Sequence, residues 1–116
     1  MRDLALHASG ILAMVVAVIH GVLGETHVFA RARIEPERTR LLLRLVWQCS
    51  AVAWFGGGVL LFVTPAIASD DARRWIVLVL TVVYVAGVAG NAWATRGRHP
   101  GWMLLAVVVA LALAGL

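Results

Sequence analysis

The polar residues with potential for chemistry gather where the first apolar run ends. The segment H-G-V-L-G-E-T-H, from His20 to His27, places two imidazoles and the Glu25 carboxylate just ahead of a cluster of arginines. Imidazole titrates near neutral pH and is a common metal ligand, and a neighbouring carboxylate can accept its proton. These residue types predict a site for a proton, a small ligand or a metal ion.

Spacing restricts a metal site within this segment. His20 and His27 share a helical face but lie seven residues apart, about 10 Å along a helix, which is too far to bind one ion together. Glu25 and His27 point to opposite sides, and the spacings H-E-x-x-H and E-x-x-H do not occur. A metal would need a broken helix or ligands from elsewhere, with His20, His27 and His99 as candidates. Haem would need two facing histidines at one depth, so no cofactor is predicted.

Residues on later apolar runs reach the depth of His20 if these runs form antiparallel helices. Gln48 lies four residues deeper than Arg44, and Asn91 lies five residues inside Arg96. A rise of about 1.5 Å per residue then predicts two polar layers at one end of the molecule. The inner layer comprises His20, Gln48 and Asn91, and the outer layer comprises Glu25, Arg44, Arg96 and His99.

Three functions remain open for these layers, and the leading one is structural. Hydrogen bonds between helices join such residues in a non-enzymatic assembly or accessory subunit, and a Glu25–Arg44 ion pair would hold both charges at a membrane interface. The alternatives are a small oligomeric transporter or channel, whose passage runs past the inner layer, and a metal- or haem-binding redox subunit. No serine or cysteine has an evident histidine–carboxylate partner, so an enzyme is not expected.

Four long apolar runs must position these residues. The chain has 116 residues, 62% of them hydrophobic, and a mean hydropathy of +0.92. A soluble domain of this size could not bury so much apolar surface, whereas runs this long match the thickness of a bilayer. We therefore predict an all-α polytopic membrane protein, a four-helix antiparallel bundle in one transmembrane domain over residues 1–116. The helices are expected at about 4–24, 41–63, 75–95 and 100–116.

Local residues indicate where these helices begin and end. Pro36 suits the first turn of the second helix, Pro65 is expected to stop it, and Ser69 or Asp70 is expected to cap the third. The fourth run is only just long enough to span. The first run is expected to stay as an anchor, because a cleaved signal peptide would have a shorter apolar region and a small-x-small site.

Small residues recur every fourth position in two runs, which lets another helix approach closely. The first stripe is Ala5, Ser9, Ala13, Ala17 and Gly21, and the second is Ala86, Gly90 and Ala94. Gly56-Gly57-Gly58 predicts close packing or a kink. So much small-residue surface predicts a homo-oligomer or a larger membrane complex. Cys49 is the sole cysteine, so no internal disulfide forms, and a buried inert thiol is expected.

The charge distribution predicts contact with membrane lipids. All ten basic residues besides histidine are arginines, and they lie between apolar runs, which is typical of topology signals and anionic head-group contact rather than nucleic acid. Those expected to face lipid are Arg31, Arg33, Arg38, Arg40, Arg96 and Arg98. The first and third connections, with Arg44, carry seven arginines against three elsewhere. Loops 25–40 and 96–100 are therefore expected in the cytosol, with both termini outside the cytoplasmic (inner) membrane, and dual orientation remains an alternative.

The H-x-x-L-G-E turn at His20–Glu25, followed by arginines and an apolar run opening with Val46-Trp47, resembles uncharacterised small four-helix integral membrane proteins of bacteria. The resemblance covers about residues 15–60 and implies architecture, not activity. That family has a histidine directly after the tryptophan, and Gln48 at this position weakens a two-histidine site.

Two other families share this size and helix count, but their sites are not reproduced. Small multidrug resistance transporters carry a glutamate within the first helix, whereas Glu25 lies at the helix end. The segment G-V-L-G-E-T-H-V-F-A-R is similar to the first-helix pattern of fluoride channels. Their Thr-Phe-Ser-Thr segment is absent, and T-V-V-Y-V-A-G at residues 81–87 does not replace it.

Overall fold

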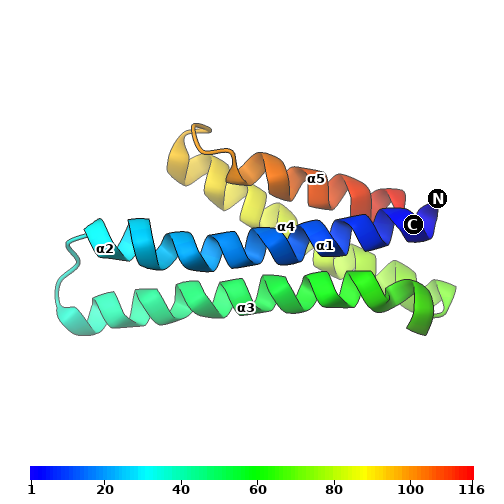
Figure 1. Cartoon of the computed structure of the whole chain (residues 1–116), viewed down its shortest axis with the longest axis horizontal. Coiled ribbons are helices and arrows are strands. Elements are labelled where there is room, and N and C mark those ends of the chain that lie inside the picture. The colour runs from blue at the N-terminus through cyan, green and yellow to red at the C-terminus, as the bar shows by residue number, and fades with distance from the viewer.

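The molecule consists of four helical rods, and consecutive rods run in opposite directions. The computed structural model describes residues 1–116, which are 87% helical with no strand, so the all-helical prediction is confirmed. The elements are α1 (Arg2–Leu23), a π-helical turn η1 (Gly24–Val28), α2 (Phe29–Arg31), α3 (Glu37–Ile67), α4 (Asp70–Thr95) and α5 (Gly101–Ala114). The first three elements continue one another as a single rod (Figure 1).

The two ends of the molecule differ in charge. The α2–α3 and α4–α5 connections lie toward one end, here named the arginine end, and the two termini lie side by side toward the other (Figure 1). Exposed arginines of these connections define the arginine end: Arg31, Arg33, Arg38, Arg96 and Arg98. At the opposite end Arg73, near the start of α4, forms an ion pair with Asp3 of α1.

Length and composition would allow three of the rods to cross a membrane. They cover Arg2–Arg31, Glu37–Ile67 and Asp70–Thr95, with 30, 31 and 26 residues. α5 has 14 residues, or about 21 Å at the helical rise, against a hydrocarbon core of about 30 Å. The helix expected over 100–116 is therefore shorter than a simple span.

One predicted helix boundary is wrong and one is confirmed. α3 passes through Pro65 and ends at Ile67. Pro65 lacks the N–H that would bond to the preceding turn, but the Ala68 N–H still bonds to the Thr64 carbonyl at 3.0 Å, which closes the last turn. The Ser69 hydroxyl caps α4 by accepting from the Ala72 N–H at 3.3 Å, as the sequence predicted.

α1 and α3 form the most extensive interface between helices. Within the first small-residue stripe, Ser9, Ala13 and Ala17 are at most 1% exposed. At the crossing a Cβ added to Gly10 would lie 2.6 Å from the Gly58 carbonyl oxygen. The two backbones therefore touch where only glycine fits, and the close packing predicted for the glycine triplet is confirmed at Gly58.

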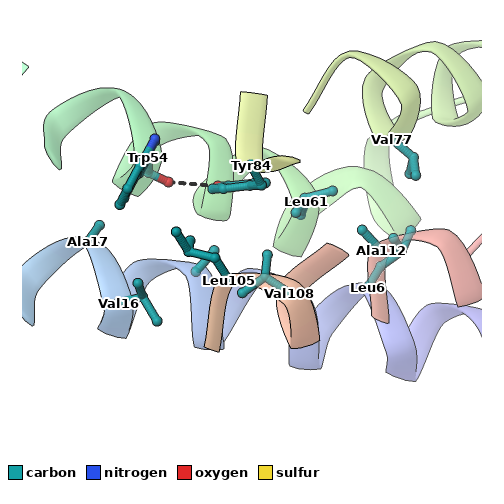
Figure 2. Close-up of a cluster of buried hydrophobic side chains, with 11 residues drawn as sticks. Leu6, Val16, Ala17, Trp54, Leu61, Val77, Tyr84, Leu105, Val108 and Ala112 are labelled. Carbon is teal, nitrogen blue, oxygen red and sulfur yellow. Dashed lines mark hydrogen bonds between the residues drawn. The ribbon is translucent and has the colours of Figure 1, made fainter. Parts of the chain in front are cut away.

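Two buried hydrogen bonds tie the remaining helices to this pair. Ser9 Oγ on α1 donates to the Val108 carbonyl of α5 at 2.8 Å, and the Tyr84 hydroxyl of α4 donates to the Trp54 carbonyl of α3 at 2.8 Å. Figure 2 shows this second bond inside the apolar core, which draws on all four helices. Trp54 belongs to this core and is 9% exposed.

Much apolar surface remains outside the core. In α4 only Val77 and Tyr84 are buried. Within an apolar stretch of 18 residues in this helix, 11% is buried. The second small-residue stripe is exposed along α4, at Ala86, Gly90 and Ala94. Cys49 is also exposed, contrary to the expectation of a buried thiol, because α3 covers α1 with its opposite face.

Candidate functional site

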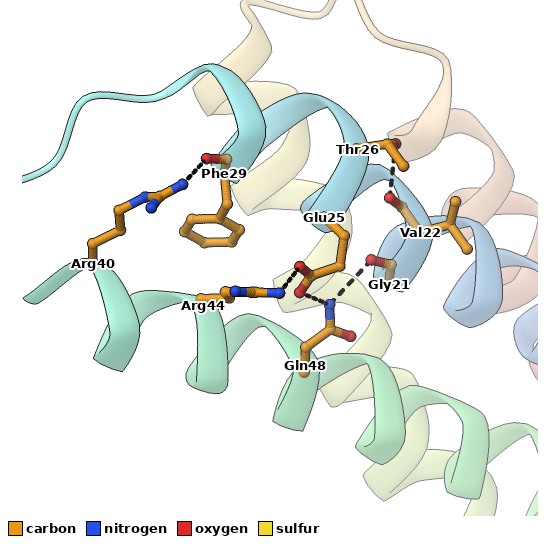
Figure 3. Close-up of polar contacts among 8 residues, drawn as sticks. All are labelled: Gly21, Val22, Glu25, Thr26, Phe29, Arg40, Arg44 and Gln48. Carbon is orange, nitrogen blue, oxygen red and sulfur yellow. Dashed lines mark hydrogen bonds and ion pairs between the residues drawn. The ribbon is translucent and has the colours of Figure 1, made fainter. Parts of the chain in front are cut away.

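The predicted ion pair forms the centre of a polar cluster between α1 and α3. Arg44 Nη2 lies 2.5 Å from Glu25 Oε2, and Gln48 Nε2 donates to Glu25 Oε1 at 2.7 Å. The same Gln48 amide nitrogen donates to the Gly21 carbonyl at 3.1 Å. Figure 3 shows Gln48 and Arg44 reaching from α3 toward Glu25. Each carboxylate oxygen thus has a donor within the chain.

The π-helical turn at Gly24–Val28 carries Glu25 into this cluster. Such wide turns interrupt the regular helical register and redirect side chains. Trp47 covers Gly24, and its indole N–H donates to the His20 carbonyl at 2.9 Å. A carbonyl oxygen has two lone pairs, so that of His20 can accept from α3 as well as from its own helix.

Arg40 closes the cluster at the arginine end. Its Nη2 donates to the Phe29 carbonyl at 2.5 Å (Figure 3), which ties the short α2 to the start of α3. Arg40 is half-buried, in contrast to the other arginines predicted to face lipid. Part of the Arg40 guanidinium is therefore engaged within the chain.

The inner layer predicted from depth is not a connected network. Gln48 bonds to Glu25 and not to His20, and the Asn91 amide donates to the Gly87 carbonyl of its own helix at 3.0 Å. Depth along a helix says nothing about rotation around it, and His20 and Glu25, five residues apart, point about 140° away from each other. Gln48 therefore meets only one of them.

His20 packs between two tryptophans of α3. Its ring stacks on Trp47 with centroids 4.2 Å apart and planes 7° apart, and it lies 4.6 Å from the Trp54 ring. His20 Nε2 is 3.1 Å from the Ser50 hydroxyl. Sequence reasoning missed these partners, although Trp47, Ser50 and Trp54 lie three and four residues apart, the spacing of one helical face.

A cavity of about 380 Å³ brings the three metal candidates together. His20 and His27 line it from the first rod, His99 from the α4–α5 turn, and Asn91 from α4. Gln48 and Glu25 instead line an open groove of about 610 Å³ over α1 and α3. The structure thus separates the predicted site residues into a paired polar cluster and a histidine-lined cavity.

The chemistry available in the cavity is hydrogen bonding and ring stacking. The chain has no group of three or more His, Cys, Asp or Glu side chains placed to hold a metal ion. Of the predicted outer layer only Glu25 and Arg44 form an ion pair, whereas Arg96 and His99 are exposed. No protein-family model, curated protein or solved structure matches the chain.

Proposed function

We propose that this chain is a small integral membrane protein that acts as a non-enzymatic assembly or accessory subunit through the outer face of α4. The observation that carries the proposal is the exposed small-residue stripe of Ala86, Gly90 and Ala94. It repeats the spacing of the small-residue stripe that is buried in α1, but nothing in the chain covers it. Small residues let two helices approach closely in lipid, where packing drives association.

The proposed placement has all four helices in the cytoplasmic membrane. The Cα extent along the longest axis is 48 Å, against about 40–45 Å for a bilayer with its head groups. The arginine end then lies in the cytosol and contacts anionic head groups, and both termini lie outside. α5 reaches the far side because Gly115 lies next to Leu6, so a thinner bilayer at α5 would complete the fourth span.

The paired polar cluster supports a structural role. Glu25, Arg44 and Gln48 bond to one another, and this pairing makes charges tolerable near the membrane interface. The cluster joins the first rod to α3, whereas α4 is the least covered of the three long helices. A transporter or channel remains the alternative, with its passage along the histidine-lined cavity.

The test is the oligomeric state of Gly90→Leu. The unaltered chain in mild detergent should be a dimer or larger, measured as protein mass by light scattering on a size-exclusion peak. A Cβ at Gly90 meets no atom within 4 Å in the chain, so the variant should fold and run as a monomer. Ala110→Leu, an exposed small-to-large change on α5, is the matched control and should keep the parent mass. A monomeric parent, or a Gly90→Leu chain with the parent mass, would contradict assembly through α4.

A further inference from the structure

The groove of about 610 Å³ over α1 and α3 is open to the surroundings of the chain. Its floor consists of small residues, Ala17 and Gly21 of α1 and Ala51 of α3, and exposed apolar side chains such as Val18 and Val52 form its walls. The groove shares no lining residue with the histidine-lined cavity, which lies where α4 and α5 pack on the α1–α3 pair. It therefore lies on another side of this pair, and the outer face of α4 cannot reach it within one chain.

The outer face of α4 has a shape that fits this groove. Its stripe of Ala86, Gly90 and Ala94 is exposed and carries no side chain larger than a methyl group. The α4 backbone can therefore pass between apolar walls and approach a floor of small residues. The lengths also agree, because the groove follows α3 over residues 48–55, about 10 Å at the helical rise, and the stripe covers about 12 Å.

The two surfaces lie at the same depth when neighbouring chains have the same orientation in a membrane. Gly87 of α4 lies against the Trp54 ring of α3, since a Cβ added to this glycine would be 2.7 Å from the ring. α3 and α4 run in opposite directions, so three residues nearer the arginine end α4 reaches Gly90 and α3 reaches Ala51. The centre of the stripe thus lies level with the floor of the groove.

This register also brings opposite charges together at the arginine end. Arg96 lies six residues beyond Gly90 on α4, and Arg44 lies seven residues beyond the groove floor on α3. Arg96 of a neighbouring copy therefore comes to the depth of the ion pair between Glu25 and Arg44.

Glu25 can accept this second guanidinium. It is the acidic residue that lines the groove, and its side chain is 35% exposed. A carboxylate has about four lone-pair sites, of which donors of its own chain use two. Arg96 is exposed and forms no ion pair within its own chain.

We propose that the outer face of α4 in one chain docks into the α1–α3 groove of a second copy, where Arg96 of the first chain binds Glu25 of the second. The inference rests on the proposed assembly through α4 and names the partner of that face. Because the two contacting surfaces differ, the contact is heterologous, and each chain offers α4 to one neighbour and its groove to another. A symmetric dimer of α4 against α4 would instead leave the groove open.

Disulfide crosslinking in native membranes, on a Cys49→Ala background, tests the proposal. The chain with both Gly90→Cys and Val52→Cys should form disulfide-linked dimers and larger products on mild oxidation, whereas each single-cysteine chain should stay monomeric. Val52 is suitable because it is 72% exposed and lines the groove. The matched control combines Gly90→Cys with Ala53→Cys, an exposed position at nearly the same depth that does not line the groove, and it should give no linked product.

The crosslinking outcomes separate this inference from the assembly proposal. Linked dimers of the chain with Gly90→Cys alone would show α4 packed on α4, which overturns docking into the groove and leaves assembly through α4 intact. The absence of linked products from the Gly90→Cys, Val52→Cys chain would likewise overturn the docking.

A bulky side chain in the groove tests the same contact without oxidation. Val52→Trp should reduce the protein mass on the size-exclusion peak to that of a monomer, whereas Ala53→Trp should keep the parent mass. A Val52→Trp chain with the parent mass would contradict docking into the groove alone. A parent chain that is itself monomeric would contradict both the docking and the assembly through α4.

Discussion

At the scale of single residues, the polar cluster is organised by pairing. Glu25 accepts from both Arg44 and Gln48, so one carboxylate determines how α1 and α3 face each other at the arginine end. The ion pair was predictable because the sequence places both residues at similar depth, near the ends of neighbouring apolar runs. The partner of Gln48 was not, because a one-dimensional depth estimate does not include rotation about the helix axis.

Exchanging the charges of Glu25 and Arg44 should separate the contribution of the ion pair to thermal stability from that of either charge alone. Glu25→Arg places a second guanidinium against Arg44, and we expect a lower melting temperature by circular dichroism in detergent. The double variant Glu25→Arg with Arg44→Glu has the two opposite charges in exchanged positions, which restores the attraction. It should therefore recover most of the lost melting temperature. Arg38→Glu, an exposed arginine of α3 without an ion pair, is the control and should melt as the parent does. Equal melting of the parent and Glu25→Arg would show that the pair contributes nothing.

At the scale of helices, two stripes of small residues with the same spacing have different surroundings. Ser9, Ala13 and Ala17 of the stripe in α1 are buried inside the bundle, whereas the stripe in α4 is exposed. Spacing identifies a surface that allows close approach, but the partner depends on how the whole chain packs. The π-helical turn at Gly24–Val28 was likewise not predictable, since it forms where Trp47 of α3 covers Gly24.

The glycine triplet of α3 offers a test of close packing with an internal control. A Cβ at Gly58 would lie 2.8 Å from the Gly10 carbonyl oxygen, whereas a Cβ at Gly56 meets nothing within 4 Å. Gly58→Ala should lower the free energy of unfolding by about 1–3 kcal/mol through overpacking. Gly56→Ala should leave it unchanged or raise it by up to about 1 kcal/mol through helix propensity. Unfolding by titration with a denaturing detergent measures both, and equal effects would contradict a close α1–α3 crossing.

At the scale of the whole molecule, composition predicted the all-helical architecture, and the arginines indicated which connections lie at one end. The number of full spans was less predictable. The run from 100 to 116 is apolar throughout and forms a helix of only 14 residues, Gly101–Ala114, with Pro100 as its N-cap and Gly115 as its C-cap. Because so short a helix begins only at Gly101, a cavity lies beside His20, a feature that no local pattern in the sequence specifies.

The proposed orientation follows from the arginine end and can be tested from either side of the membrane. On a Cys49→Ala background, a cysteine at Glu35 lies in the α2–α3 connection and one at Asp71 lies at the start of α4, both exposed. A membrane-impermeant maleimide added to intact spheroplasts should label Asp71→Cys, and it should reach Glu35→Cys only after lysis. The physical reason is that short arginine-rich loops are retained in the cytosol. Labelling of both cysteines before lysis would indicate dual insertion, and labelling of Glu35→Cys alone would reverse the orientation and place the histidine-lined cavity toward the outer face.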